Sequence, residues 1–399
     1  MIFIAMPVGS AHGWGICGKY ITREMVNVTG GKARLLTQQL TLEGIGDELE
    51  YQALAAVVCT QEDAKGARVI NGVTHLDGPL LSCVVDKQMQ SWQPGLRGTR
   101  TLGYTFFEEN VLQPEWMDNA RRNFDVVATG SSWCTEVLKG YGLTNVHTVI
   151  QGVDGRIFAP AAGGGAGAVG AGDPMREFLK DRFVVFSGGK FEYRKGQDIV
   201  IRAVKVMQER HKDVVLVNAW FNAWQQSFDT MRASPHLKWP TASGAFVEVM
   251  NKLLAENGLD MTRVLTLGQR PNALMARIYH NTDVGIFPNR CEGGTNLVLM
   301  EYMACGKPVV ATASTGHGDV VREGNAKIIA IKGKTTVGGG AAGPVAQWPE
   351  PDVEDAVEKL EWMYQNREAA GALGRRAGED MAKTTWAESA RGFERLLRG

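Results

Sequence analysis

The segment 289–312, NRCEGGTNLVLMEYMACGKPVVAT, carries the residues whose types and spacing point most clearly to chemistry. Its two carboxylates, Glu292 and Glu301, are separated by eight residues. Because an ionised carboxylate only accepts hydrogen bonds, such a pair suits hydroxyl-rich partners such as a sugar or a ribose. Adjacent glycines before a helix let backbone N–H groups approach an anionic or hydroxylated ligand closely. We therefore predict a strand ending at Pro288 and a ligand-binding loop and helix start made of Gly293, Gly294, Thr295, Asn296 and Leu297, with Thr295 and Asn296 at the N-cap.

A second segment, 186–196, reads FSGGKFEYRKG and combines glycines with three cations. It follows a predicted strand and precedes a predicted helix. Lys190, Arg194 and Lys195 place three positive charges after Gly188 and Gly189, which is one possible arrangement for a functional segment. The competing interpretation is a solvated turn with three surface charges.

The N-terminal loop 9–18, GSAHGWGICG, matches G-x-G-x-x-G at Gly13, Gly15 and Gly18. The pattern is typical of dinucleotide binding when it directly follows a strand. Here residues 7–12 intervene, and Gln38 and Gln39 stand where a ribose-binding acid is expected. His12, beside the glycines, is either a ligand-binding group or a structural histidine.

These segments must be positioned by elements that alternate between short apolar runs and helical patterns. Predicted strands recur along residues 2–150 and again along 183–311, which is typical of an α/β protein with largely parallel sheets. A Gly/Ala-rich stretch between them cannot form a core and is predicted to be a linker or surface loop. We predict domains at 1–158 and 175–385, joined by 159–174.

Two further patterns have a less specific interpretation. A second Gly-rich loop is predicted at 333–343. Trp220, Trp224 and Phe228 recur at helical spacing, which favours a core position over a sugar-stacking or lipid-facing platform.

The amino-acid composition argues against some classes of function. The chain has 399 residues, with 43 Lys+Arg and 43 Asp+Glu, so the formal net charge is zero. This balance argues against a dedicated nucleic-acid-binding protein. No apolar run approaches the ~20 residues of a membrane span. Six scattered cysteines form no C-x-x-C pair, and no metal-ligand cluster is evident. We expect reduced thiols, no metal and a cytoplasmic protein.

The segment 289–312 resembles the donor-sugar motif of retaining GT-B glycosyltransferases of the family 4 type (glycosyl transferases group 1). The resemblance lies in the loop glutamate, the glycine turn, the helix with a second glutamate and the stretch MACGKPVVAT. It implies two Rossmann-like, doubly wound domains facing each other across a cleft. It also implies that Glu292 binds hydroxyls of the transferred sugar and that Glu301 binds the ribose. The family has seven residues between its glutamates, whereas this chain has eight.

The resemblance extends to other segments. FSGGKFEYRKG is similar to the family segment whose Arg and Lys hold the leaving diphosphate, with Lys190 where Arg is usual and Lys195 in the Lys-Gly pair. LTLGQRP, at 265–271, resembles the loop over the nucleotide base and implies a contact from Arg270. The terminal helix 386–399 is similar to one that packs back on the first domain. The Gly-rich loop and GYTFFEEN, at 103–110, imply cleft-lining residues: Gly15 toward the phosphates, and His12, Gly13, Trp14 and Glu108 (or Glu109) toward the acceptor.

The expected activity is metal-independent, retaining transfer of a sugar from a UDP- or GDP-linked donor to a hydroxyl acceptor. The catalytic candidates are Glu292, Lys195 and Lys190, and no cofactor besides the donor is expected. Alternatives are glycosylation of a hydroxylated DNA base, a GT-B-fold sugar-nucleotide epimerase and an NAD-dependent oxidoreductase. Arginines near the C-terminus allow peripheral membrane attachment. The acceptor, the donor base and the oligomeric state stay open.

Overall fold

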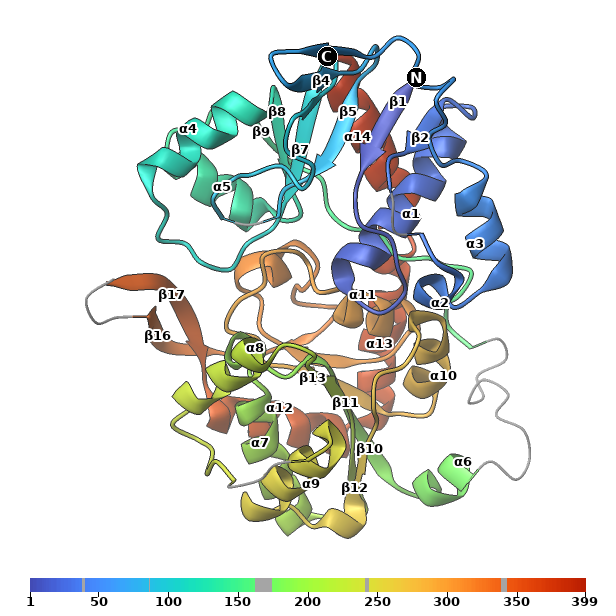
Figure 1. Cartoon of the computed structure of the whole chain (residues 1–399). Helices are drawn as coiled ribbons and strands as arrows, with labels where there is room; N and C mark the ends of the chain where they lie inside the picture. Colours follow the sequence, from blue (N-terminus) through green and yellow to red (C-terminus); the bar gives the residue numbers. More distant parts are fainter. Residues whose placement is uncertain (38–39, 86, 162–173, 241–243, 339–342) are drawn as a thin grey trace.

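The computed structural model describes residues 1–37, 40–85, 87–161, 174–240, 244–338 and 343–399 (Figure 1). Gln38 and Gln39, most of the predicted linker and part of the second Gly-rich loop lie outside these ranges. The elements form two α/β units, each built on a six-stranded sheet.

The N-terminal unit has the sheet order β2-β1-β5-β7-β8-β9, and every pair in it is parallel. Its central strands are buried apolar runs, as expected where helices cover both faces. The strands are β1 (Ile2–Ala5), β2 (Ala33–Leu35), β5 (Leu80–Cys83), β7 (Thr101–Thr105), β8 (Val126–Thr129) and β9 (Val146–Thr148). The helices are α1 (Gly13–Val28), α2 (Leu42–Ile45), α3 (Glu48–Ala55), α4 (Pro114–Asn123) and α5 (Ser132–Gly140). A small sheet joins β3 (Arg68–Ile70), β4 (Val73–His75) and β6 (Leu96–Arg97).

The C-terminal unit has the order β12-β11-β10-β13-β14-β15, again with parallel pairs. The order reverses between β10 and β13, and ligands of such sheets bind beyond the carboxyl ends of the strands at that point. The strands are β10 (Phe183–Lys190), β11 (Val214–Phe221), β12 (Val264–Thr266), β13 (Val284–Phe287), β14 (Val309–Ala311) and β15 (Lys327–Ile328). The helices are α6 (Pro174–Leu179), α7 (Gln197–Arg210), α8 (Gln225–Asp229), α9 (Phe246–Glu256), α10 (Met275–His280), α11 (Leu297–Ala304), α12 (Val353–Gln365) and α13 (Arg367–Met381). Short 3-10 turns include η1 (Tyr193–Lys195), η4 (Asn272–Leu274) and η5 (Thr315–Asp319).

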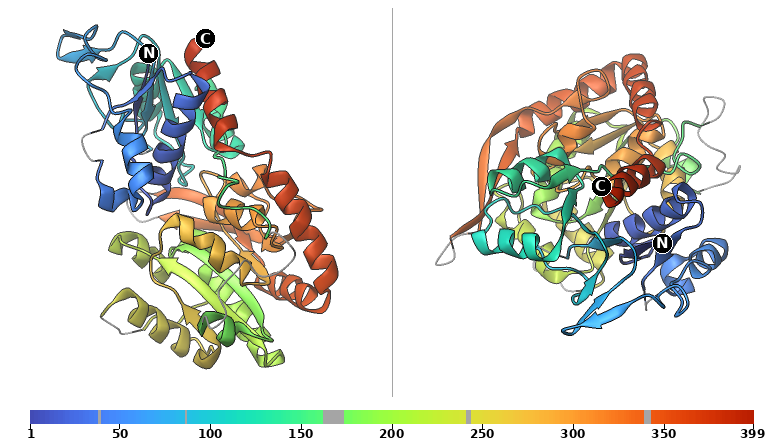
Figure 2. Two further views of the ribbon diagram at one scale, coloured as in Figure 1. Left: turned by 90° about the vertical axis from the view of Figure 1, so that its right-hand side faces the viewer. Right: turned by 90° about the horizontal axis from the view of Figure 1, so that it is seen from above.

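The last helix, α14 (Trp386–Arg398), leaves the C-terminal unit and runs along α1 (Figures 1 and 2). Trp386 stacks on Tyr20 with ring centroids 5.4 Å apart, and Phe393 meets Tyr104 at 4.8 Å. The chain end therefore belongs to the core of the N-terminal unit. The two doubly wound domains predicted from the alternation are confirmed, and so is the α/β class.

Two sequence predictions were wrong in detail. The described part of the second Gly-rich loop belongs to a β-hairpin of β16 (Ile331–Gly338) and β17 (Pro344–Pro351), because Thr335, Thr336 and Val337 favour a strand despite the neighbouring glycines. Trp220, Trp224 and Phe228 do not share a helix, although the predicted core position is confirmed for Trp220 and Phe228. Trp220 is buried in β11, Trp224 lies in the loop before α8 with 47% of its surface exposed, and Phe228 is in α8.

Candidate active site

Two loops meet at the carboxyl ends of β10 and β13, where the strand order reverses. The Arg194 carbonyl accepts hydrogen bonds from the backbone N–H groups of Arg290 (2.8 Å) and Cys291 (3.1 Å). Gly196 has φ +71°, and a Cβ there would lie 2.1 Å from the Pro288 carbonyl oxygen. The close approach of the loops therefore requires glycine at this position.

The buried carboxylate of Glu292 is the centre of the site. Its Oε1 lies 2.5 Å from Lys195 Nζ, and its Oε2 lies 3.0 Å from Arg194 Nη1. Asn289 also donates a hydrogen bond to it. Burial alone would raise the pKa of Glu292, but the Lys195 ammonium and then Arg194 outweigh burial and hold the pKa at about 2. Glu292 is thus a carboxylate at neutral pH, paired with the two cations predicted to hold phosphate.

The cations of this site are balanced by carboxylates. Arg194 Nη2 lies 2.6 Å from Glu192, and its Nη1 lies 3.3 Å from Glu108 of the N-terminal unit. Lys190 Nζ is 3.7 Å from Glu192. We call Lys190, Arg194, Lys195, Glu108, Glu192 and Glu292 the charge cluster. Its formal charge is zero, because three carboxylates balance the three cations.

Lys190 also contacts an exposed aromatic ring. Its ammonium lies 5.0 Å from the centroid of the exposed Trp224 ring, and the His12 ring lies 4.9 Å from the same indole. Burial and then the Lys190 charge lower the pKa of His12. This contact brings His12 of the N-terminal unit next to Lys190 of the C-terminal unit.

Glu301 lies in a separate buried position on α11. It accepts hydrogen bonds from Asn272 Nδ2 at 2.7 Å and from the Tyr279 hydroxyl at 3.3 Å. Burial raises its pKa to about 8, and those two hydrogen bonds offset the rise only in part. Arg270 lies on the surface nearby, where its guanidinium contacts the adjacent Gln269 carbonyl.

The glycine loop after Glu292 packs directly against the N-terminal unit. Ser131 Oγ donates to the Gly293 carbonyl at 2.6 Å. A Cβ on Gly293 would lie 2.4 Å from the Phe107 carbonyl oxygen, and one on Gly294 would lie 2.6 Å from Gln151 Oε1. Leu297 packs against the hydrophobic core of the N-terminal unit. The predicted ligand loop is therefore also the contact between the domains.

Asn296 takes the N-cap position of α11 with φ +63°, but its side chain does not cap the helix. Its amide instead lies 3.1 Å from Nε2 of the fully buried His317. The other ring nitrogen of His317 lies 3.1 Å from the Thr312 carbonyl. Burial lowers the pKa of His317 to about 4, so the ring is neutral and donates through Nδ1. The neighbouring Thr295 hydroxyl contacts Met300 Sδ at 2.9 Å.

The G-x-G-x-x-G match lies inside helix α1 rather than in a loop before it, with His12 at the N-cap. A Cβ on Gly15 would lie 3.0 Å from Gly9 N, and one on Gly18 would lie 1.9 Å from the Pro7 carbonyl oxygen. These two glycines allow the chain after β1 to pass close to α1. Gly13 has open space around it, and Trp14 stacks on Phe106 with centroids 4.1 Å apart.

Several residues of the site carry no recognisable sequence signal. Arg290 is fully buried and forms two 2.8 Å contacts with Asp198 of α7, while Glu350 of β17 also binds its guanidinium. Its place directly before Cys291 and Glu292 was the only indication available. Asn289, Glu192, Asn272 and Tyr279 are likewise recognisable only from their contacts.

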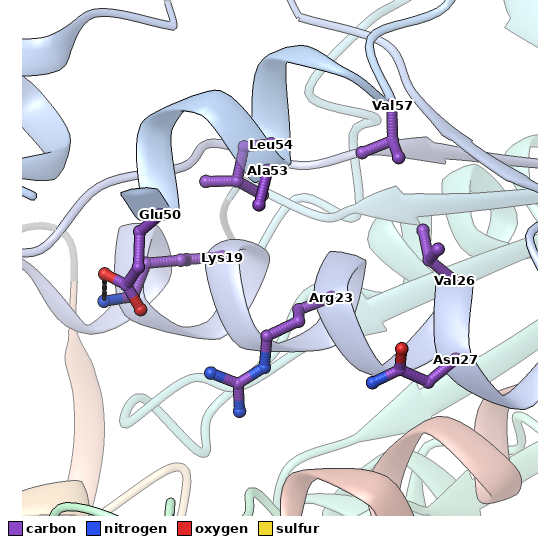
Figure 3. A pocket seen from close by; sticks show the side chains of 8 residues that line it. All are labelled: Lys19, Arg23, Val26, Asn27, Glu50, Ala53, Leu54 and Val57. Carbon is purple, nitrogen blue, oxygen red and sulfur yellow. Dashed lines mark hydrogen bonds and ion pairs between the residues drawn. The ribbon is translucent and has the colours of Figure 1, made fainter. Parts of the chain in front are cut away.

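A cavity of about 180 Å³ lies apart from the charge cluster, between α1 and α3 (Figure 3). Ala53, Leu54 and Val57 line one wall, and the α1 residues Lys19, Arg23, Val26 and Asn27 line the other. Lys19 is paired with Glu50 at 2.8 Å, and Arg23 with Asp154 at 3.1 Å. Its lining residues are Lys19, Arg23, Val26, Asn27, Glu50, Ala53, Leu54 and Val57.

Within the described ranges, no group of three or more His, Cys, Asp or Glu side chains is arranged to hold a metal ion. No helix in this part of the chain is long and apolar enough to cross a membrane.

The chain is similar in sequence and in fold to several known proteins. Residues 174–337 match the sequence model of the family "Glycosyl transferases group 1". A D-inositol 3-phosphate glycosyltransferase of Thermomonospora curvata is 29% identical over 220 residues, which cover 51% of this chain and 44% of that protein. A GDP-mannose-dependent alpha-(1-6)-phosphatidylinositol monomannoside mannosyltransferase of Mycolicibacterium smegmatis is 28% identical over 37% of this chain and 34% of its own length. The chain thus spans about half the length, or less, of these curated relatives.

Solved structures match over the whole chain. The sucrose-phosphate synthase of Thermosynechococcus elongatus has a TM-score of 0.66 at 16% identity and covers 100% of this chain and 98% of its own. Anabaena HepE, in complex with UDP and glucose, has a TM-score of 0.60 at 13% identity, with 100% and 99% covered. The chain therefore has the GT-B fold, and its residues 174–337, which supply most of the charge cluster, match the group 1 glycosyltransferases.

Proposed function

We propose that this protein is a retaining glycosyltransferase that moves a sugar from a nucleoside-diphosphate sugar to a hydroxyl acceptor without a metal ion. The observation that carries the proposal is the meeting of Lys195, Arg194 and Glu292 at the strand-order reversal of the C-terminal unit. The family match over the same residues supports it. The donor would lie mainly on the C-terminal unit, and the acceptor on the N-terminal unit.

The cations would stabilise the leaving group. Transfer breaks the bond between the sugar C1 and a phosphate oxygen, so negative charge grows on the diphosphate. Lys195 and Arg194 lie in a water-poor site and are held in place before the reaction, which is how enzymes stabilise such charge most effectively. Lys190, at the exposed edge, would add charge next to them. These residues would take the part that a divalent metal plays elsewhere.

Glu292 would orient the sugar rather than attack it. In the structure Lys195 contacts one of its oxygens and Arg194 the other. When the diphosphate binds these cations, the Glu292 carboxylate becomes available to accept hydrogen bonds from sugar hydroxyls. Glu301, beside Asn272, would accept from the ribose. Arg270 would approach the base from the surface.

The donor base is proposed to be uracil or guanine. The relatives include a GDP-mannose-dependent enzyme, and a structural neighbour was solved with UDP. One of these relatives is named for D-inositol 3-phosphate and another for phosphatidylinositol monomannoside. We propose a hydroxyl compound as the acceptor here, without choosing between free and lipid-linked forms.

The alternatives separate on simple assays. A GT-B-fold epimerase would convert the nucleotide sugar without an acceptor. A DNA-modifying transferase would bind DNA in a salt-dependent manner. The oxidoreductase is not supported by the position of Gly13, Gly15 and Gly18 inside α1.

The proposed function is tested by ligand-induced thermal stabilisation with UDP, GDP, ADP and NAD. A ligand that binds only the folded state raises Tm by mass action. We expect UDP or GDP to raise Tm, and Lys195→Ala to abolish most of the rise. Transfer or donor hydrolysis should fall by about 10²–10³ in the same variant. Lys212→Ala, an exposed lysine just after α7, is the matched control.

Stabilisation by NAD alone, or by none of the nucleotides, would contradict the transferase assignment. Activity that EDTA removes would contradict the metal-independent part of it. The anomeric configuration of the released or transferred sugar, followed by NMR, tests retention.

A further inference from the structure

The β16–β17 hairpin extends from the C-terminal unit beside α4 and α5 of the N-terminal unit (Figure 1). It lies outside both main sheets, and its strands pair only with each other within the described residues. Nothing in the roles proposed above uses it. It contacts the N-terminal unit at one edge, and at its base it contacts residues next to the charge cluster.

The outer edge of β17 binds loop 108–111, which belongs to the N-terminal unit. The Val111 backbone N–H donates to the Val345 carbonyl at 3.1 Å. The Asn110 side chain makes two hydrogen bonds to the backbone of Gln347, at 2.9 and 3.2 Å. The buried indole of Trp348 donates to the Glu108 carbonyl at 2.7 Å. These contacts fix loop 108–111 much as an added strand is fixed at a sheet edge.

The base of the hairpin is anchored next to the reacting groups. Glu350, at the end of β17, binds the buried guanidinium of Arg290 at 2.7 and 2.8 Å. Arg290 also stacks over the Tyr193 ring at 3.9 Å, and Trp348 lies 6.4 Å from the same ring. Because Tyr193 directly precedes Arg194, the hairpin and the phosphate-binding loop are held as one body.

Through these contacts the hairpin sets the position of a carboxylate from the opposite domain. The Glu108 side chain lies 3.3 Å from Arg194, whereas the adjacent Glu109 pairs with Lys87 within its own domain. Glu108 is therefore the acidic residue of the N-terminal unit that completes the neutral charge cluster. We propose that the β16–β17 hairpin is an interdomain clasp that holds Glu108 on Arg194 as a resident counter-ion, and that an incoming nucleoside diphosphate displaces this carboxylate.

The displacement rests on the proposed function, since it needs a diphosphate site at Arg194 and Lys195. It makes Trp348 and Glu350 positioning residues, which act through Glu108 and Arg290. Once displaced, the Glu108 carboxylate stays tethered at its backbone by Trp348. Its two oxygens are then free to accept a hydrogen bond from a hydroxyl group of the acceptor substrate.

The test measures nucleotide binding by titration calorimetry with UDP and GDP. Glu108→Gln removes a negative charge that competes with the diphosphate, so we expect its Kd to fall about five- to tenfold. Trp348→Phe keeps an aromatic ring, although a smaller one, and removes the indole N–H that binds the Glu108 carbonyl. We expect its Kd to fall about two- to fivefold as Glu108 loosens. The double variant should bind no more tightly than Glu108→Gln, because both changes act on one carboxylate.

Two controls and one independent measurement separate the possible outcomes. Glu109→Gln removes an equal charge from the next residue, and Lys334→Ala changes an exposed position on β16; both should leave Kd unchanged. Hydrogen exchange at the Val111 amide should be slow in the wild type without nucleotide and faster in Trp348→Phe.

If the wild type binds UDP or GDP but neither variant binds more tightly, the clasp proposal is wrong while the proposed function stands. Fast exchange at Val111 in the wild type would overturn the clasp equally. If the wild type binds no nucleotide, the proposed function fails, and the counter-ion displacement fails with it.

Discussion

Two buried glutamates of the C-terminal unit differ in the charge their surroundings favour. Glu292 lies against Lys195 and Arg194, and its pKa is about 2. Glu301 has only neutral hydrogen-bond donors, Asn272 and Tyr279, in direct contact, and burial raises its pKa to about 8. The same residue type is thus ionised at one position and mostly protonated at neutral pH at the other.

This difference predicts a pH dependence of nucleotide binding. If ribose hydroxyls donate to the Glu301 carboxylate, only the ionised form binds well. Because the pKa of Glu301 in the free protein is about 8, its ionised fraction falls about tenfold from pH 9 to pH 7. The Kd for UDP or GDP should therefore rise about tenfold over that range. Titration calorimetry at several pH values measures this. Glu301→Gln should bind weakly with no such dependence; an equal dependence in that variant would assign it to another group.

At the scale of elements, Arg290 joins three segments behind the charge cluster. Its guanidinium binds Asp198 on α7 and Glu350 on β17, and its backbone N–H binds the Arg194 carbonyl. Asp198 is itself fully buried and accepts a hydrogen bond from Ser234. Such a charge network fixes relative position, and its cost appears when one partner is removed.

We expect Arg290→Met to lower the free energy of unfolding by about 3–5 kcal/mol, because it leaves the Asp198 charge buried and unpaired. Denaturant unfolding followed by tryptophan fluorescence measures the change. Arg210→Met, which removes a half-exposed ion pair with Glu361, should cost no more than about 1 kcal/mol. If Arg290→Met lowered the free energy of unfolding by no more than this control does, the network would contribute little to stability.

At the scale of the whole molecule, the two units meet where the loop at Gly293 and Gly294 packs against the N-terminal unit. Gly293 and Gly294 leave no room for a side chain against Phe107 and Gln151. Ser132 adds a backbone and a side-chain hydrogen bond to Asp319 of η5. The closed arrangement therefore depends on close backbone packing at the site itself.

Gly293→Ala should hold the domains apart without unfolding either one. Its Cβ would lie 2.4 Å from the Phe107 carbonyl oxygen, so the backbones must separate. We expect a larger radius of gyration by small-angle scattering and at least a tenfold loss of turnover, since closure excludes water and completes the site. Gly140→Ala, on α5 with open space around it, is the control. An unchanged radius with full turnover in Gly293→Ala would show that the interface is not strained by one methyl group.

The sequence by itself determined the two alternating α/β units and the segments that carry the chemistry. Buried parallel strands are continuous apolar runs, and glycines with carboxylates or lysines follow them at β10 and β13. These are local signals, readable within about ten residues. They located Glu292, Lys195 and Arg194, which the structure brings together. The return of the Trp386 helix to the first domain was implied by the family resemblance and not by a local signal, and the structure confirms it.

Only the tertiary structure decided which partners those residues have. Arg290 and Asp198 are far apart in sequence, and Glu108 meets Arg194 only because two domains and a hairpin place them together. The hairpin looked like a glycine-rich loop, since strand pairing is itself a contact between distant residues. The G-x-G-x-x-G match had the spacing of a dinucleotide-binding motif, yet the structure gives its glycines another use. Gly15 and Gly18 let the chain after β1 pass close to α1, and only the folded chain creates that requirement.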